Sequence, residues 1–158
     1  MRATAYHFRH QATVPAPRAQ VHEVLLDLFH YVDWWPQVRA VGRLGTDDAL
    51  LVCRSVLPYD LEVRAHAVSR EADCLEVAVD GPLAGSVRWA LDDLGEDGTR
   101  LRFDQQVRVD AWSLVVGSWL ARPLLVANHR WMMRGAVRGL AARLAADRAQ
   151  PSAATAAS

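Results

Sequence analysis

Six histidines are the side chains in this 158-residue chain that most often do chemistry, and their spacing excludes most catalytic and metal sites. His22 and Glu23 match the first two residues of the His-Glu-x-x-His helix motif of zinc proteases, but Leu26 occupies the position of the second histidine ligand. His7 and His10 lie three residues apart on a predicted strand, so they face opposite sides of it. The sequence also contains no Gly-x-Ser-x-Gly elbow, phosphate loop or dinucleotide fingerprint. We therefore expect no metal site, and hydrolase, kinase and dehydrogenase chemistry are all disfavoured.

The charged residues balance, and this balance excludes several classes of partner. Eighteen basic residues, all of them arginine, stand against eighteen acidic residues, so the formal net charge is zero. A protein without net charge has no overall field that attracts nucleic acid or an anionic membrane surface. We therefore expect neither of these as a partner, and we expect a monomer or a homodimer.

The cysteines and the first residues of the sequence indicate the compartment. Cys53 and Cys74 lie alone in apolar runs without Cys-x-x-Cys spacing, so we expect two buried, reduced thiols and no disulfide. Residues 1–8 alternate in polarity and lack the apolar core of a signal peptide. No stretch approaches the roughly 20 apolar residues that span a bilayer. These features favour a cytoplasmic protein without a membrane span.

The length and the composition along the chain predict one domain. A chain of this size buries roughly 70% of its unfolded surface in a single core. We expect residues 1–147 to form that domain. Residues 148–158 are rich in alanine and serine and lack large apolar side chains, so we predict a disordered tail there.

Alternating polar and apolar residues predict an antiparallel sheet. Residues 6–14 alternate with a period of two, which is typical of a half-buried strand. Further strand-like runs follow, separated by turn residues at 45–48, 58–60, 71–73, 81–84 and 95–98. In each run the apolar side chains face one way and the charged ones face the other, so one face is dry. We expect a curved sheet of about six to seven strands.

Helical spacing occurs in two parts of the chain. Apolar residues recur at this spacing from Arg18 to Phe29, and the aromatic residues 31–36 then stop the helix, so we expect two short helices after the first strand. A long helix is expected to begin at Pro123, because proline suits a first helical position. On a helical wheel His129 lies near the centre of its apolar arc, opposite a solvated arginine stripe. That arc holds Leu125, Met132, Met133, Ala136, Val137, Leu140 and Leu144, and the stripe holds Arg130, Arg134 and Arg138.

This order of elements resembles the helix-grip superfamily of START, Bet v 1-like and polyketide cyclase/dehydrase domains, also called SRPBCC. The residues that carry the resemblance are 14–17 (Val-Pro-Ala-Pro), 31–36 (Tyr-Val-Asp-Trp-Trp-Pro), Arg88-Trp89 and Gly98-Thr99. The segment 128–135 (Asn-His-Arg-Trp-Met-Met-Arg-Gly) is similar to the last-helix motif of bacterial polyketide cyclase/dehydrase-type proteins. The resemblance implies an α+β fold in which the curved sheet wraps around the C-terminal helix and leaves a cavity between them.

Several side chains on the predicted dry side would line that cavity, and each has a structural alternative. For residues such as His129 and Gln105 the more common role is that of a core residue satisfied by one hydrogen bond, and Trp34 and Trp35 are also compatible with core aromatics. The strand phase is ambiguous around Cys53, Ser55 and Tyr59. The candidate cavity residues are Tyr6, His10, Trp35, Trp89, Phe103, Gln105, Met132, Met133, Ala136 and Leu140.

Two function classes fit these candidates. The first is a domain that binds a small hydrophobic molecule, such as an aromatic or polyketide-like one, through burial of apolar area. The second, implied by the resemblance, is a cofactor-independent polyketide cyclase, aromatase or dehydratase. In it His129 would shuttle a proton near neutral pH, and Tyr59 or Tyr6 would donate to an enolate oxygen. A stress or interaction protein with a vestigial cavity is a third, weaker reading. We favour binding, and we expect no cofactor.

Overall fold

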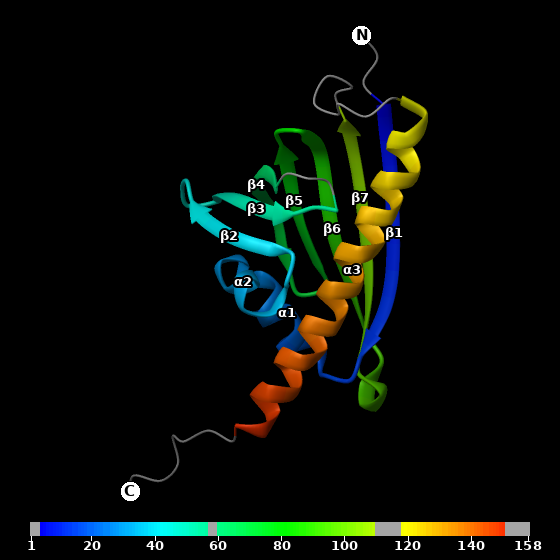
Figure 1. Cartoon of the computed structure of the whole chain (residues 1–158). Coiled ribbons are helices and arrows are strands. Elements are labelled where there is room, and N and C mark those ends of the chain that lie inside the picture. Colours follow the sequence, from blue (N-terminus) through cyan, green and yellow to red (C-terminus); the bar gives the residue numbers. More distant parts are fainter. Residues whose placement is uncertain (1–3, 57–59, 110–117, 151–158) are drawn as a thin grey trace, which may run out of the picture.

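The structure is a computed structural model that describes residues 4–56, 60–109 and 118–150. Its main element is an antiparallel seven-stranded sheet with the strand order β1-β7-β6-β5-β4-β3-β2. The sheet curves, and β1 and β2 form its two edges (Figure 1). The predicted curved antiparallel meander is therefore confirmed. The strands are β1 (Thr4–Val14), β2 (Val38–Arg43), β3 (Asp48–Arg54), β4 (Asp60–Glu71), β5 (Cys74–Asp80), β6 (Leu83–Asp93) and β7 (Thr99–Val109).

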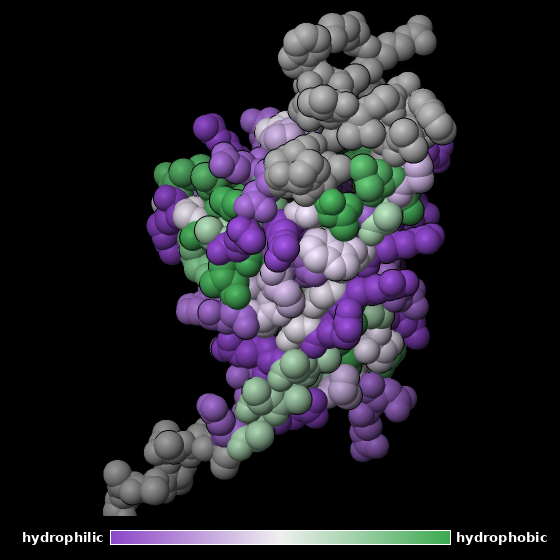
Figure 2. Space-filling model, viewed as in Figure 1, coloured by the Kyte–Doolittle hydropathy of each residue, from purple (hydrophilic) through white to green (hydrophobic). Residues whose placement is uncertain are grey.

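Alternation gives the sheet a dry inner face and a solvated outer face, as the sequence predicts. On β4, Leu61 and Ala65 are buried, whereas Glu62 and Arg64 are exposed. Successive side chains of a strand point to opposite faces, so this pattern places the apolar set of β4 on the inside. The surface seen in Figure 2 is mostly polar, with apolar side chains gathered over β2 and β3 and over the first half of the long helix.

Three short helical elements follow β1, and the first is shorter than predicted. They are α1 (Arg18–Leu26), the 3-10 helix η1 (Leu28–His30) and α2 (Tyr31–Trp34). The prediction that the first helix reaches Phe29 is wrong, because the backbone of Asp27 leaves the helical conformation (φ −83°, ψ 75°). The Asp27 carboxylate lies 2.6 Å from Nδ1 of His30. Aspartate competes for local hydrogen bonds in this way, which favours a helix end.

The long helix α3 (Ser118–Ala149) crosses the inner face of the sheet (Figure 1). The prediction that it begins at Pro123 is wrong, because the helix begins at Ser118 and contains Pro123. Proline near a helix start removes only one backbone hydrogen bond, close to an end whose first N–H groups have no intrahelical partner. The predicted helix phase is confirmed, because Met133 and Leu140 are buried and Arg134 is exposed. No helix in the described part of the chain is long and apolar enough to cross a membrane.

Two glycines hold α3 close to the preceding elements. A Cβ atom added at Gly139 would clash with the backbone oxygen of Trp34, and one added at Gly135 would clash with the side chain of Gln37. The backbone of α3 makes its close approaches to β1, α1 and α2. The helix is therefore anchored along one side of the dry face, and the inner side chains of β3, β4 and β5 lie further from it.

Candidate functional site

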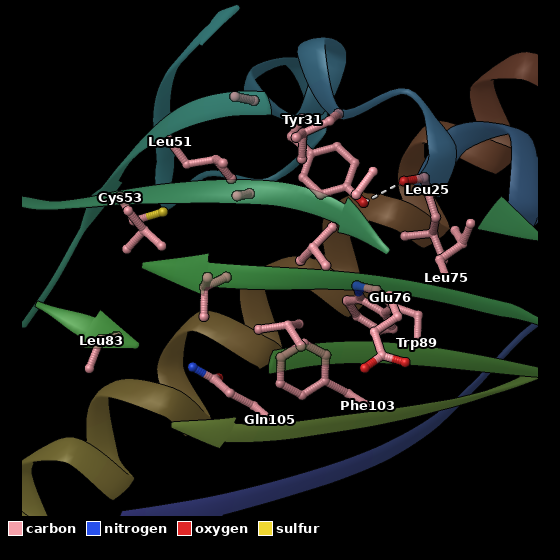
Figure 3. A pocket seen from close by; sticks show the side chains of 18 of the residues that line it. Leu25, Tyr31, Leu51, Cys53, Leu75, Glu76, Leu83, Trp89, Phe103 and Gln105 are labelled. Atoms are coloured by element: carbon pink, nitrogen blue, oxygen red, sulfur yellow. Dashed lines mark hydrogen bonds between the residues drawn. The ribbon is translucent and has the colours of Figure 1, made fainter. Parts of the chain in front are cut away.

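A cavity of about 280 Å³ lies between the inner face of the sheet and α3. Ligand pockets in proteins are mostly apolar with a few polar groups, and the lining of this cavity has that composition. Figure 3 shows side chains of β3, β5, β6 and β7 that point into it. The β-strand residues of its lining include Ala49, Leu51, Cys53, Leu61, Val63, Ala65, Ala67, Leu75, Val77, Val79, Val87, Trp89, Phe103 and Gln105.

Small side chains on the inner face explain why the space is open. The strand register aligns Val79 of β5 with Ala65 of β4 and with Ala49 of β3. A neighbouring row aligns Val77 with Ala67. Alanine side chains do not reach across to α3, which is anchored over β1, so this half of the dry face encloses a cavity.

The wall near α3 is a continuous run of aromatic rings. The ring centroids of Trp35 and Trp89 lie 6.5 Å apart, and those of Trp89 and Phe103 lie 4.8 Å apart, both edge to face. Phe103 is 5.5 Å from the His129 ring, which stacks on Phe8 at 4.6 Å. Edge-to-face and offset stacked contacts are the arrangements that aromatic pairs prefer. These contacts fix the rings of the wall relative to one another.

His129 is inserted into this wall in an uncharged state. Its Nε2 atom is buried and has no hydrogen-bond partner among the described residues. Burial, reinforced by the nearby His10, lowers the pKa of His129 to about 4. At neutral pH the ring is therefore uncharged. A pKa this low does not favour the proton transfer near neutral pH that is predicted for His129.

The low pKa of His129 predicts that stability decreases on the acid side. Unfolded histidine titrates near ~6.5, so as the pH falls from there toward about 4 only the unfolded chain takes up this proton. The free energy of unfolding therefore decreases over this pH range. Above pH ~6.5 His129 is neutral in both the folded and the unfolded chain, so its contribution to stability is constant. Between neutral pH and about pH 4.5, we expect the melting temperature of His129→Phe to decrease less than that of the wild type. Equal acid shifts in both proteins would contradict this.

Two further titratable groups of the cavity are also moved away from neutrality. Burial, helped by Asp60, raises the pKa of the Cys53 thiol to about 11. Burial and Asp27 raise the pKa of Tyr31 well above its ordinary value. The Tyr31 hydroxyl donates a 2.6 Å hydrogen bond to the backbone oxygen of Leu25 (Figure 3). A general acid or base works best with a pKa near the working pH, and these groups do not meet that condition.

Asn128 connects α3 to the end of β3 beside the cavity. The Oδ1 atom of this buried side chain accepts hydrogen bonds from the backbone N–H of Val56 (2.9 Å) and from the Ser55 hydroxyl (3.3 Å). Trp35 makes a second connection, because its indole N–H donates to the backbone oxygen of Met132 at 3.1 Å. These bonds set the position of α3 relative to the cavity wall.

Exposed side chains mark where the cavity reaches the surface. Leu26 of α1, Asp48 of β3 and Arg70 of β4 all line the cavity and are solvent-exposed. Across this rim Arg70 donates a 2.6 Å hydrogen bond to the carboxylate of Asp47. In the described part of the chain no three metal-ligating side chains come together.

The structure brings part of the predicted site together. Tyr6 and His10 lie on the inner face of β1 on either side of Phe8, and Ala136 and Leu140 lie in the core between α3 and the sheet. These four do not line the cavity as the described residues define it. Tyr59 lies outside the described residues. The predicted residues that do line it are His129, Trp35, Trp89, Phe103, Gln105, Met132 and Met133.

Some lining residues were missed by the sequence reasoning. Phe8 lines the cavity but is not among the candidate residues, although it lies two residues from both Tyr6 and His10 and therefore shares their face of β1. Asn128 precedes His129 in the last-helix motif, and its place there was an unused signal. The two cysteines, expected to be buried, are both half-buried and form no disulfide, and Cys53 faces the cavity.

The comparisons with known proteins agree with this geometry. The family model described as polyketide cyclase/dehydrase and lipid transport matches residues 5–145. No curated protein matches the chain.

Among solved structures, the Zhui aromatase/cyclase from a Streptomyces species is 20% identical, with a TM-score of 0.75 over 98% of this chain and 100% of that one. A START superfamily protein from Mycobacterium smegmatis is 15% identical, with a TM-score of 0.74 over 89% of this chain and 97% of that one. A Thermus thermophilus protein is 15% identical, with a TM-score of 0.74 over 90% and 99%. At these identities the likeness concerns the fold alone, whereas the family model spans most of the sequence. The chain therefore belongs to the polyketide cyclase/dehydrase and lipid transport family.

Proposed function

We propose that this protein binds a small hydrophobic molecule in the cavity between the sheet and α3. The observation that carries the proposal is a cavity of about 280 Å³ with a continuous aromatic wall. An apolar cavity of about 150 Å³ holds one benzene molecule, so the space here suits roughly two fused rings. The family, which includes lipid transport proteins, supports the same class of ligand.

The experiment is a titration with naphthalene, followed through tryptophan fluorescence. Trp35 and Trp89 line the cavity, so a bound ring system should change their emission in a saturable way. Native mass spectrometry of freshly purified protein would in addition identify a ligand acquired in the cell. Absence of saturable binding of both naphthalene and its hydroxylated derivative 2-naphthol would overturn the proposed function.

A cyclase reaction in the same cavity is the alternative, and it has less support. It rests on the family and on the fold of the Streptomyces aromatase/cyclase. Against it stands the direction of the pKa shifts of His129, Cys53 and Tyr31, all of which move away from neutrality. Incubation with a poly-β-ketone surrogate distinguishes the two. Ring-closed product well above the spontaneous rate, lost in His129→Ala, would favour the enzyme.

A further inference from the structure

One polar side chain interrupts the apolar inner face of β7. Gln105 follows Phe103 on this face and is followed there by Val107, and both of these neighbours are buried. Its amide makes no hydrogen bond to any other described residue, and neither of its polar atoms is fully buried as Nε2 of His129 is. Gln105 lines the cavity, and Figure 3 shows its side chain beside Phe103, on the cavity side of β7. An accessible amide that has no partner in the described part of the chain is available to a ligand.

The strand register shows how a ligand would lie relative to this amide. Gln105, Val87, Val77 and Ala67 form one row across β7, β6, β5 and β4, and all four line the cavity. Three strand spacings give this row a span of about 14 Å, which exceeds the length of two fused rings. A ligand with its rings over Val87 and Val77 places one end at Gln105.

Charge complementarity excludes an anionic group at that end. The amide of Gln105 is neutral, and the His129 ring, which lines the same cavity, is uncharged at neutral pH. The charged side chains that line the cavity already have partners, because Arg70 pairs with Asp47 and Glu76 pairs with Arg88. Asp48 pairs with His66. A carboxylate taken into the cavity would lose its hydration without gaining a cation, which disfavours its binding.

We propose that the cavity selects an uncharged aromatic molecule of about two fused rings that carries a hydroxyl or carbonyl group, and that Gln105 recognises this group. The inference rests on the proposed ligand-binding function and adds the chemical class of the ligand. The amide provides both a donor and an acceptor, so it pairs with either group. Once a ligand excludes water from the cavity, an amide left without a partner weakens binding.

The test compares 2-naphthol, naphthalene and 2-naphthoate at neutral pH, where only 2-naphthoate is ionised. The wild type should bind 2-naphthol about tenfold more tightly than naphthalene, the effect of one hydrogen bond made in place of an unpaired amide. It should bind 2-naphthoate most weakly. In Gln105→Leu the preference for 2-naphthol over naphthalene should fall to nearly one, because naphthalene no longer leaves an amide without a partner and 2-naphthol no longer gains a hydrogen bond.

Gln106→Leu is the matched control. The side chain of Gln106 is on the outer face and donates to Asp104 at 3.3 Å, so this variant should keep the wild-type order of affinities. Gln105→Met replaces Gln105→Leu if thermal denaturation shows that the leucine variant is not folded. Binding of 2-naphthoate equal to that of 2-naphthol, or an unchanged preference in the Gln105 variant, would overturn the inference. Failure of all three probes to bind would overturn the proposed function itself.

Discussion

Met133→Arg is expected to unfold the protein. Met133 is 1% exposed and belongs to the core cluster in which α3 packs on the sheet with Leu101 and Leu140. An arginine there would bury a charge without a partner, which costs at least about 3 kcal/mol. Because the total stability of a domain is about 5 to 15 kcal/mol, this loss removes much of the margin. Chemical denaturation and near-ultraviolet circular dichroism measure the outcome.

The adjacent residue provides the control for this prediction. Arg134 is exposed on the solvent side of α3, so Arg134→Ala should change the free energy of unfolding by no more than about 0.5 kcal/mol. The two variants differ by one position along the helix and therefore by about 100° around it. Equal losses of stability would contradict the orientation of α3.

Ala67→Phe is expected to abolish ligand binding while the protein remains folded. Ala67 is half-buried on the inner face and lines the cavity in the row that ends at Gln105. A phenyl ring at this position would occupy the space that a two-ring ligand needs. Filling an existing cavity avoids the overpacking that destabilises a close-packed core. Naphthalene affinity should fall by at least about a hundredfold, the loss expected when several kcal/mol of burial are no longer available.

Val68→Phe is the matched control for the cavity variant. Val68 follows Ala67 on β4, but it is 58% exposed, because adjacent strand residues point to opposite faces. The same aromatic side chain there should leave naphthalene affinity within about twofold of the wild type. Loss of binding in both variants, or full binding in Ala67→Phe, would show that the ligand does not lie on the inner face of β4.

Local patterns in the sequence were sufficient for much of the fold. Alternation along β4 separates Leu61 and Ala65 from Glu62 and Arg64, and it does so without knowledge of the neighbouring strands. Helical spacing likewise placed Met133 on the buried side of α3. The helix ends were less predictable, because Asp27 and Pro123 are compatible with more than one local conformation and the tertiary structure selects among them.

The cavity was decided by contacts between residues far apart in the sequence. Its volume depends on the register that aligns Ala49, Ala65 and Val79 and on the glycines that anchor α3 away from them. The uncharged state of His129 also depends on burial by Phe8 and Phe103 and on its approach to His10. A sequence pattern reports which way each side chain points. It does not report how far the opposite wall lies, because that distance is set by the packing of the whole domain.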